Sequence, residues 1–403
     1  MMKIFCLLLV VFLPFIAAAQ SPIPPGAKLD TVVSGLSQLE GPVWKDGLGL
    51  LFSDIARSRI YLWSPSDSSI TIYLYPSDSS NGLTLDAQGR LILTQMQKRR
   101  VSRQESNGTI TPLASTFRGK KFNSPNDLVV KSDGSIFFTD PDFNIPAGQT
   151  KELSFKGVYR ISPSGTVALL DSVFDKPNGL CFSPDETQFY VNESPQGKIY
   201  AWDVVNDSII TNKRLLYTIP LGGYSDGMKV DPEGNIYCTG PTGVWIISPD
   251  GEYLDKIATP PNHNPSNCTW GDTDRKTLYI TTGNATPGSG FIYRIRLASG
   301  TGIENHGSVI PDKFELYANY PNPFNPNTQI EYGLQEAAHV NLTIYNIKGQ
   351  KVETLIDGDR NAGIHKLTWN SSSVQGKEIA GGIYLLRLQA GESQKIQKLV
   401  LLK

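Results

Sequence analysis

Histidine and cysteine are scarce, with four of each in 403 residues. The region before residue 298 holds one histidine, His263, so a multi-histidine zinc or iron site is excluded there. No Cys/His zinc spacing and no Gly-rich phosphate loop occur. A Ser-His-Asp triad would have to use His263, which lies in a turn-rich stretch and is expected to be a loop residue.

Long apolar runs are also lacking after the N-terminus. Residues 1–20 carry one basic residue, Lys3, then an apolar run that ends in Ala17-Ala18-Ala19. This pattern predicts a cleaved signal peptide, with a core helix as the alternative. No later stretch is long and apolar enough to predict a transmembrane segment. We expect export through the periplasm.

Net charge is nearly absent too, at -1. A chain this close to neutral lacks the excess of positive charge that is typical of proteins that bind nucleic acid or an anionic membrane. Three cysteines remain after the predicted cleavage, Cys181, Cys238 and Cys268, each in an apolar strand-like segment. We expect buried small side chains, with one disulfide as the alternative.

What the sequence does contain is an internal repeat. Six segments open with an acid or amide, usually followed by glycine, and continue as short strands and turns. The six opening residues are Glu40, Asn81, Asn126, Asn178, Asp226 and Asn267. They lie 41 to 52 residues apart, which is typical of a four-stranded propeller blade.

The turns and second strands recur at matching offsets. Turns such as Asp86–Gly89 supply the Gly or Asp that a tight hairpin needs. Second strands such as Ile136–Thr139 follow, and residues 28–34 could supply the strand that closes the sixth blade. The repeat predicts an all-β fold with a six-bladed β-propeller; an unrelated all-β array is the alternative.

Equivalent positions of all blades converge on the channel of a propeller. The six opening residues would then ring one mouth with two acids and four amides, an oxygen donor set that suits a hard divalent cation. The alternative is that Asn-Gly and Asp-Gly merely fill turns. Six such residues in register favour a metal site.

Residues 28–297 resemble the SMP-30/gluconolactonase/LRE-like propellers. The resemblance lies in Leu39–Trp44, Ser124–Val130, Phe138–Pro141, Lys176–Leu180 and Asp226–Asp231 with Tyr237–Pro241. It implies a divalent cation held by Glu40, Asn178 and Asp226, with calcium expected first and zinc, manganese or magnesium as alternatives. It also implies that Asn126 contacts the metal, its water or the substrate.

The family resemblance implies metal-assisted hydrolysis of a small-molecule lactone, an ester. We expect Asp226 to be the catalytic base, since a carboxylate there can touch the metal and accept a proton. Some family members carry Arg at the position of Ser124 in this chain. We expect Ser124 and Asn126 to contact the substrate. Lys121 or Asn123 could partly replace that Arg, and Asp140 is expected to hold a turn rather than react.

Two other functions remain open from the sequence. Phosphotriesterase-type propellers such as diisopropyl fluorophosphatase use a similar ring, and a propeller can also bind a sugar or peptide without catalysis. The segments Phe143–Phe155 and Pro260–Asn267 are the longest loops that could cover the site.

The tail has a different pattern. Residues 299–313 read as a polar linker, and 314–403 as a small Ig-like β-sandwich. The tail resembles the type A C-terminal sorting domain of the type IX secretion system, through Tyr320–Pro326, Ile344–Gln350, Gly381–Tyr384 and Lys398–Val400. The resemblance implies secretion or cell-surface attachment by that machinery. A carbohydrate-binding module is the alternative. The expected domains are therefore 1–20, 21–298, 299–313 and 314–403.

Overall fold

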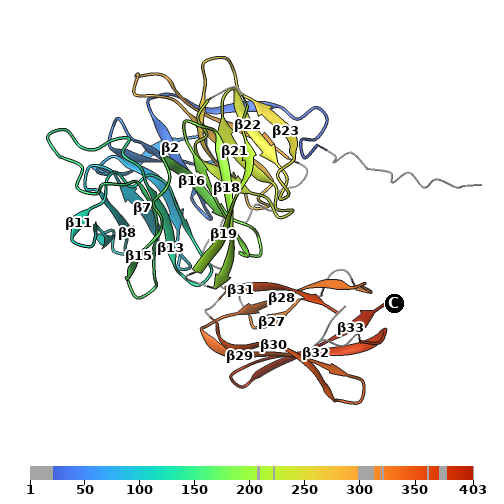
Figure 1. The fold of residues 1–403 in the computed structure, drawn as a ribbon. Coiled ribbons are helices and arrows are strands. Elements are labelled where there is room, and N and C mark those ends of the chain that lie inside the picture. The colour runs from blue at the N-terminus through green and yellow to red at the C-terminus, as the bar shows by residue number, and fades with distance from the viewer. Residues whose placement is uncertain are drawn as a thin grey trace, which may run out of the picture.

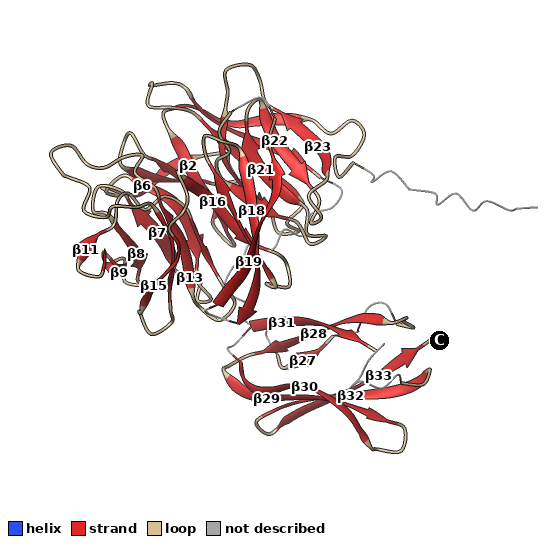
Figure 2. Ribbon diagram, viewed as in Figure 1, coloured by secondary structure: helices blue, strands red, loops and turns tan. Residues whose placement is uncertain are grey.

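The protein is described here from a computed structural model. The structure describes residues 21–206, 209–220, 223–297, 313–317, 319, 322–360, 363–371 and 379–402. The predicted signal peptide and almost all of the predicted linker lie outside these ranges. All regular structure within them is strand, which confirms the all-β prediction (Figure 2). The described residues hold no helix that could span a membrane.

The N-terminal region forms six four-stranded sheets, numbered here as blades in chain order (Figure 1). Their strands are β2 (Leu39–Lys45), β3 (Gly49–Asp54), β4 (Arg59–Trp63) and β5 (Ile70–Leu74); β6 (Ser80–Leu85), β7 (Leu91–Gln95), β8 (Arg100–Gln104) and β9 (Ile110–Ala114); β12 (Leu128–Val130), β13 (Ile136–Asp140), β14 (Gly157–Ile161) and β15 (Val167–Asp171); β16 (Pro177–Phe182), β17 (Gln188–Glu193), β18 (Lys198–Asn206) and β19 (Ile209–Thr218); β20 (Met228–Val230), β21 (Ile236–Gly240), β22 (Gly243–Ile247) and β23 (Tyr253–Ala258); and β24 (Pro265–Gly271), β25 (Thr277–Thr282), β26 (Gly290–Arg296) and β1 (Leu29–Leu36). A short hairpin, β10 (Thr116–Phe117) and β11 (Lys120–Lys121), precedes the third blade.

The sheets close into a ring. The first strands of the blades, β2, β6, β12, β16, β20 and β24, contact one another in cyclic order, and β24 meets β2. The sixth sheet is completed from the other end of the region, because β1 pairs antiparallel with β26 through Leu29 and Ile295. This confirms the expected closing strand, which becomes the outer strand of the sixth sheet.

Glycine after the opening residue lets neighbouring blades approach closely. A Cβ added at Gly41 would meet the carbonyl oxygen of Asn81 at 2.1 Å. One added at Gly179 would meet the carbonyl oxygen of Asp226 at 2.3 Å. The Asn-Gly and Asp-Gly pairs of the sequence are therefore packing requirements between blades.

A buried hydroxyl or amide in each second strand joins its blade to the next. These six side chains, Ser53, Thr94, Thr139, Asn192, Thr239 and Thr281, are all fully buried. Thr94 and Thr139 donate to the carbonyl oxygens of Asn126 and Asn178, both at 2.8 Å. Three further junctions are made by Ser53 with Ser80, Asn192 to Asp226 and Thr239 to Ser266. At the sixth junction Thr281 contacts Ser266 of its own sheet, and Ser266 Oγ donates to the carbonyl of Leu39 in the first blade. We call these six contacts the inter-blade latches.

Apolar side chains fill the spaces between neighbouring sheets. One such cluster combines Val43 and Leu51 of the first blade with Leu83 and Leu93 of the second. Inner strands such as β3 and β7 are therefore buried along their whole length, because a neighbouring sheet covers each of their faces.

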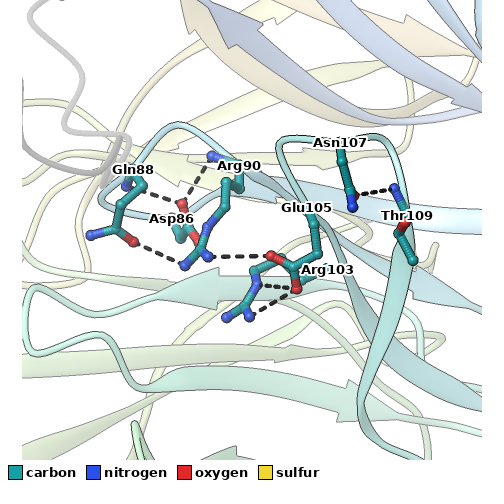
Figure 3. Close-up of polar contacts among 7 residues, drawn as sticks. All are labelled: Asp86, Gln88, Arg90, Arg103, Glu105, Asn107 and Thr109. Atoms are coloured by element: carbon teal, nitrogen blue, oxygen red, sulfur yellow. Dashed lines mark hydrogen bonds and ion pairs between the residues drawn. The ribbon is translucent and has the colours of Figure 1, made fainter.

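The predicted turns lie at the opposite face from the opening residues. Gly89 N donates to the carbonyl of Asp86 at 2.8 Å, as expected for the hairpin between β6 and β7. Arg90 joins this turn to the next one through Asp86 Oδ2 at 2.7 Å and Glu105 Oε2 at 3.3 Å, and Arg103 also contacts Glu105 (Figure 3). These pairs are half-buried and join the two turns at this face.

The C-terminal region forms a separate pair of sheets that share one core. The strands are β27 (Glu315–Leu316), β28 (Asn327–Leu334) and β31 (Gly363–Asn370) in one sheet, and β30 (Lys351–Arg360), β29 (Ala338–Asn346), β32 (Gly382–Ala390) and β33 (Ser393–Leu401) in the other. Tyr332 and Trp369 from the first sheet pack with Leu342 and Leu386 from the second.

Replacing Thr139 by Val tests the latches. The substitution keeps the shape but leaves the buried carbonyl of Asn178 without this donor, which should cost about 1–3 kcal/mol of unfolding free energy. Urea unfolding followed by tryptophan fluorescence measures the change. Thr71→Val, at an exposed position of β5, is the matched control and should stay within about 0.5 kcal/mol of the wild type. Equal stability of the two variants would contradict the role given to the latches.

Candidate metal-binding and catalytic site

The opening residues lie together at one mouth of the channel. Each stands at or just before the start of a first strand, so ring closure brings them to the same end. Five of them, Glu40, Asn81, Asn126, Asn178 and Asn267, are at least 94% buried. Asp226 retains partial exposure. The predicted convergence is thus present in the structure.

Side-chain contacts cross the channel. Asn267 Nδ2 lies 3.3 Å from Glu40 Oε2 and 3.3 Å from Asp127 Oδ2. Asn267 belongs to the sixth blade and Asp127 to the third, which faces it across the ring. Asn178 also hydrogen-bonds to the carboxylate of Asp226. The site is therefore compact enough for these side chains to act together.

Asp127 is the member of this cluster that the sequence reasoning missed. It follows Asn126 at the position where four other blades have glycine. Its Oδ1 accepts from Leu128 N at 2.9 Å and occupies space left by Gly82, whose added Cβ would be 2.7 Å away. The break in the glycine pattern was the available signal.

Three carboxylates now share one poorly hydrated space. Burial and the neighbouring Asp127 charge raise the pKa of Glu40 to about 8, against hydrogen bonds from Gly41 and Asn267. Burial, then the charges of Glu40 and Asp127, raise the pKa of Asp226 well above its ordinary value. Desolvated like charges repel, so the ionised cluster favours a nearby cation.

Amide oxygens complete the donor set. Asn81 Oδ1 and Asn178 Oδ1 are buried and have no hydrogen-bond partner. Within the described ranges, no three His, Cys, Asp or Glu side chains could hold a metal ion by themselves. A metal would therefore need these amides beside the carboxylates. The resulting oxygen set fits a hard divalent cation such as calcium.

A buried aspartate holds the loop that carries Ser124. Asp140 accepts from the backbone N of Asn123 and of Ser124, each at 2.7 Å. Ser124 is fully buried and its Oγ has no partner, whereas Lys121 is exposed. Asp140 is thus a structural anchor, as expected, and burial raises its pKa to about 7.

A serine triad finds no support in the geometry. Gly223–Gly227 matches Gly-x-Ser-x-Gly, but Ser225 is buried, its Oγ has no partner, and the next element is β20 rather than a helix. His263 stacks on Phe291 at 4.2 Å and bonds with the Tyr293 hydroxyl. It is therefore a packed loop residue that does not reach Ser225.

Cys181, Cys238 and Cys268 are free and buried, which confirms the first of the two alternatives. The segment after His263 is not all loop, because β24 begins at Pro265.

Each of the two regions matches a known protein family. Residues 39–284 match the model of the SMP-30/Gluconolactonase/LRE-like region. The chain belongs to this family. Residues 318–402 match the secretion system C-terminal sorting domain, which confirms the resemblance seen in the tail.

Individual relatives agree with the family assignment. The chain is similar to a gluconolactonase of Zymomonas mobilis, 33% identical over 62% of this chain and 78% of the relative. It is also 25% identical to the diisopropyl-fluorophosphatase of Loligo vulgaris, over 44% of this chain and 60% of that one. A solved gluconolactonase of Xanthomonas campestris superposes with a TM-score of 0.62 at 32% identity, covering 68% of this chain and 91% of that one.

The anchor role of Asp140 predicts a pH effect on stability. Between pH about 4 and 7 the folded state holds a proton on Asp140 that the unfolded state releases, so this group's contribution to the unfolding free energy falls as pH rises. Asp140→Asn removes that dependence. Urea unfolding at pH 5 and pH 8 measures it: the stability of the wild type relative to Asp140→Asn should fall between the two. A difference that is constant or grows with pH would refute the raised pKa.

Proposed function

We propose that the N-terminal region is a metal-dependent lactonase. The observation that carries the proposal is the convergence of Glu40, Asp127 and Asp226 with unpartnered amide oxygens at one mouth of a gluconolactonase-family fold. The gluconolactonase relatives indicate a lactone, a cyclic ester, as the substrate class.

Glu40, Asn178 and Asp226 would hold the cation, with Asn126 beside it. Calcium is our first candidate, and zinc, manganese or magnesium remain alternatives. A bound divalent cation would polarise the ester carbonyl and stabilise the charge that develops on its oxygen. The chain's part is to keep three oxygen-bearing side chains at or just before the start of the first strands, in a space poor in water.

Asp226 would act as the general base. Of the three carboxylates it alone keeps partial exposure at the mouth, where an attacking water could reach it. The hydrogen bond from Asn178 orients its carboxylate and favours the ionised form. Asn126 and the Ser124 loop, held by Asp140, would orient the substrate.

Two alternatives make different use of the same ring. The similarity to a diisopropyl-fluorophosphatase supports a calcium-dependent phosphotriesterase as the second candidate. The third candidate is a sugar- or peptide-binding propeller without catalysis. Assays with both ester classes separate them, since the third predicts turnover of neither.

The C-terminal region supports a proposal about location. Its match to a secretion sorting domain fits recognition by the type IX secretion machinery, after passage through the periplasm directed by residues 1–20. The product would be secreted or attached to the cell surface.

Asp226→Asn tests the base. The variant keeps the size and an oxygen but cannot accept the proton, so lactone hydrolysis should fall by at least 10²-fold, by the usual magnitude of general-base catalysis. Proton release from gluconolactone by the full chain, with calcium present, measures it. Asp67→Asn, at an exposed turn, is the matched control and should leave the rate unchanged. Full activity of Asp226→Asn would rule out its catalytic role.

Calcium affinity should increase with pH. Without the cation, Glu40 keeps its proton up to pH about 8, so binding at pH 6 to 7 must release it. Titration calorimetry at pH 6, 7 and 8 should show tighter binding at each step, with proton release that shrinks towards pH 8. EDTA should lower the melting temperature and calcium should restore it. Binding that does not vary with pH would contradict this assignment of Glu40.

A further inference from the structure

One turn of the second blade departs from the repeat. In three other blades the residue before the third strand is Ser58, Gly197 or Thr242, each with a φ between 51° and 64°. The second blade has Arg99 at this position, with a φ of 54°, and its side chain is almost fully buried. A small residue suffices for this left-handed turn in the other blades. The buried guanidinium therefore needs partners of its own to be stable there.

Those partners come from two segments of the third blade. Arg99 Nε donates to the carbonyl oxygen of Phe122 at 2.5 Å. Nη1 donates to Gln149 Oε1 at 3.2 Å and to the carbonyl oxygen of Thr150 at 3.1 Å, and it lies 3.8 Å from Glu152 Oε1. Nη2 is buried and makes no hydrogen bond with the described residues. If the segment of Gln149 moved away, the buried charge would keep one hydrogen bond, so Arg99 and this segment hold each other in place.

The second of these segments is the connection from β13 to β14, residues 141–156, which we call the wall loop. It lies against the stretch that leads to the opening residue of the third blade. Glu152 Oε2 accepts from Lys121 N at 2.8 Å, and the carbonyl oxygen of Phe155 accepts from Asn123 Nδ2 at 2.9 Å. One end of the wall loop is thus fixed to the substrate side of the proposed site.

The other end of the wall loop reaches the fourth blade. Lys176 Nζ lies 4.8 Å from the centre of the Phe143 ring, which is a cation–π contact. Lys176 stands two residues before the opening residue Asn178, in the same register as Ser124 in the third blade. The wall loop therefore contacts the approaches to two neighbouring opening residues, beside the mouth of the channel.

We propose that Arg99 is a positioning residue that fixes the wall loop at the mouth as a preformed side of the lactone site. A preformed side raises affinity, because binding then requires no further ordering of the loop. The inference rests on the proposed lactonase function and deepens it by naming the element that determines affinity for the substrate.

Arg99→Lys tests the role of the guanidinium. Lysine keeps the charge but has no planar fork, so it cannot reproduce the bonds of Nε and Nη1 to both segments. KM for gluconolactone should rise about ten-fold while kcat stays within about two-fold, because only molecules with the loop in place bind substrate well. Initial rates of the full chain with calcium measure both. Arg103→Lys makes the same change in β8, where the side chain contacts Glu105 at the opposite face, and should alter neither constant.

Gln149→Ala is a second variant that approaches the contact from the loop. The side chain is exposed, so its loss removes one partner of Arg99 without disturbing the core, and KM should rise by a smaller factor. Trypsin cleavage after Lys151, in the exposed part of the wall loop, adds a measurement that does not depend on activity. Cleavage there should be faster in both variants than in the wild type. Arg99→Lys leaves the number of trypsin sites unchanged, since trypsin cuts after either residue.

The outcomes separate this inference from the proposed function. A merely structural role of Arg99 would lower kcat or the melting temperature and leave KM as in the wild type. An unchanged KM in both variants, with an active wild type, overturns the role of Arg99 alone, even where cleavage at Lys151 is faster, because the loop would then lie outside the substrate site. Absence of lactone hydrolysis by the wild type overturns the proposed function, and this role in substrate affinity with it.

Discussion

The close approach of neighbouring first strands is the constraint on which the site depends. Glycine at positions such as Gly41 and Gly179 removes the Cβ that would collide with the next blade. Buried donors such as Thr139 then satisfy the carbonyl of the next opening residue. Because these contacts recur around the ring, residues 41 to 52 positions apart in the chain meet at one mouth. Backbone hydrogen bonds inside the blades could form without this geometry, but the site could not.

The same closure creates an electrostatic problem. Glu40, Asp127 and Asp226 are brought together where water is scarce, and burial raises the pKa of Glu40 and Asp226. A protein gains nothing in stability from such a cluster, since desolvated like charges repel. The latches and the apolar contacts between blades must outweigh this cost. Perturbed carboxylates of this kind gather at functional sites, which is why their presence here favours chemistry over packing.

The sequence predicted the parts of this arrangement that repeat. Register alone placed Glu40 and Asn267 at the same mouth, and the structure puts their side chains 3.3 Å apart. It also predicted strand β1 as the closing strand and the buried state of the cysteines. It missed Asp127, which departs from the repeat. It also could not give the link between Asp140 and the Ser124 loop, because the β12–β13 hairpin brings these residues near each other without fixing which groups the Asp140 side chain contacts. Contacts that recur in every blade can be predicted from the repeat in the sequence, whereas contacts made by single residues outside the repeat are found only in the structure.

Burial distinguishes the charged groups of the site from one another. Lys229 lines a cavity together with Val43 and Cys181 and is partly exposed. Glu40 is buried and suits a ligand whose ionisation is tied to the cation. Asp226 keeps partial exposure at the mouth, so its carboxylate can exchange a proton with solvent. A general base must exchange its proton with solvent after each turnover, and the partial exposure of Asp226 permits this exchange. Glu40 and Asn178, which are more buried, would keep holding the cation while Asp226 carries the proton. Glu40 and Asp226 hold the same place in the repeat, so it is their different burial that determines which of these roles each can take.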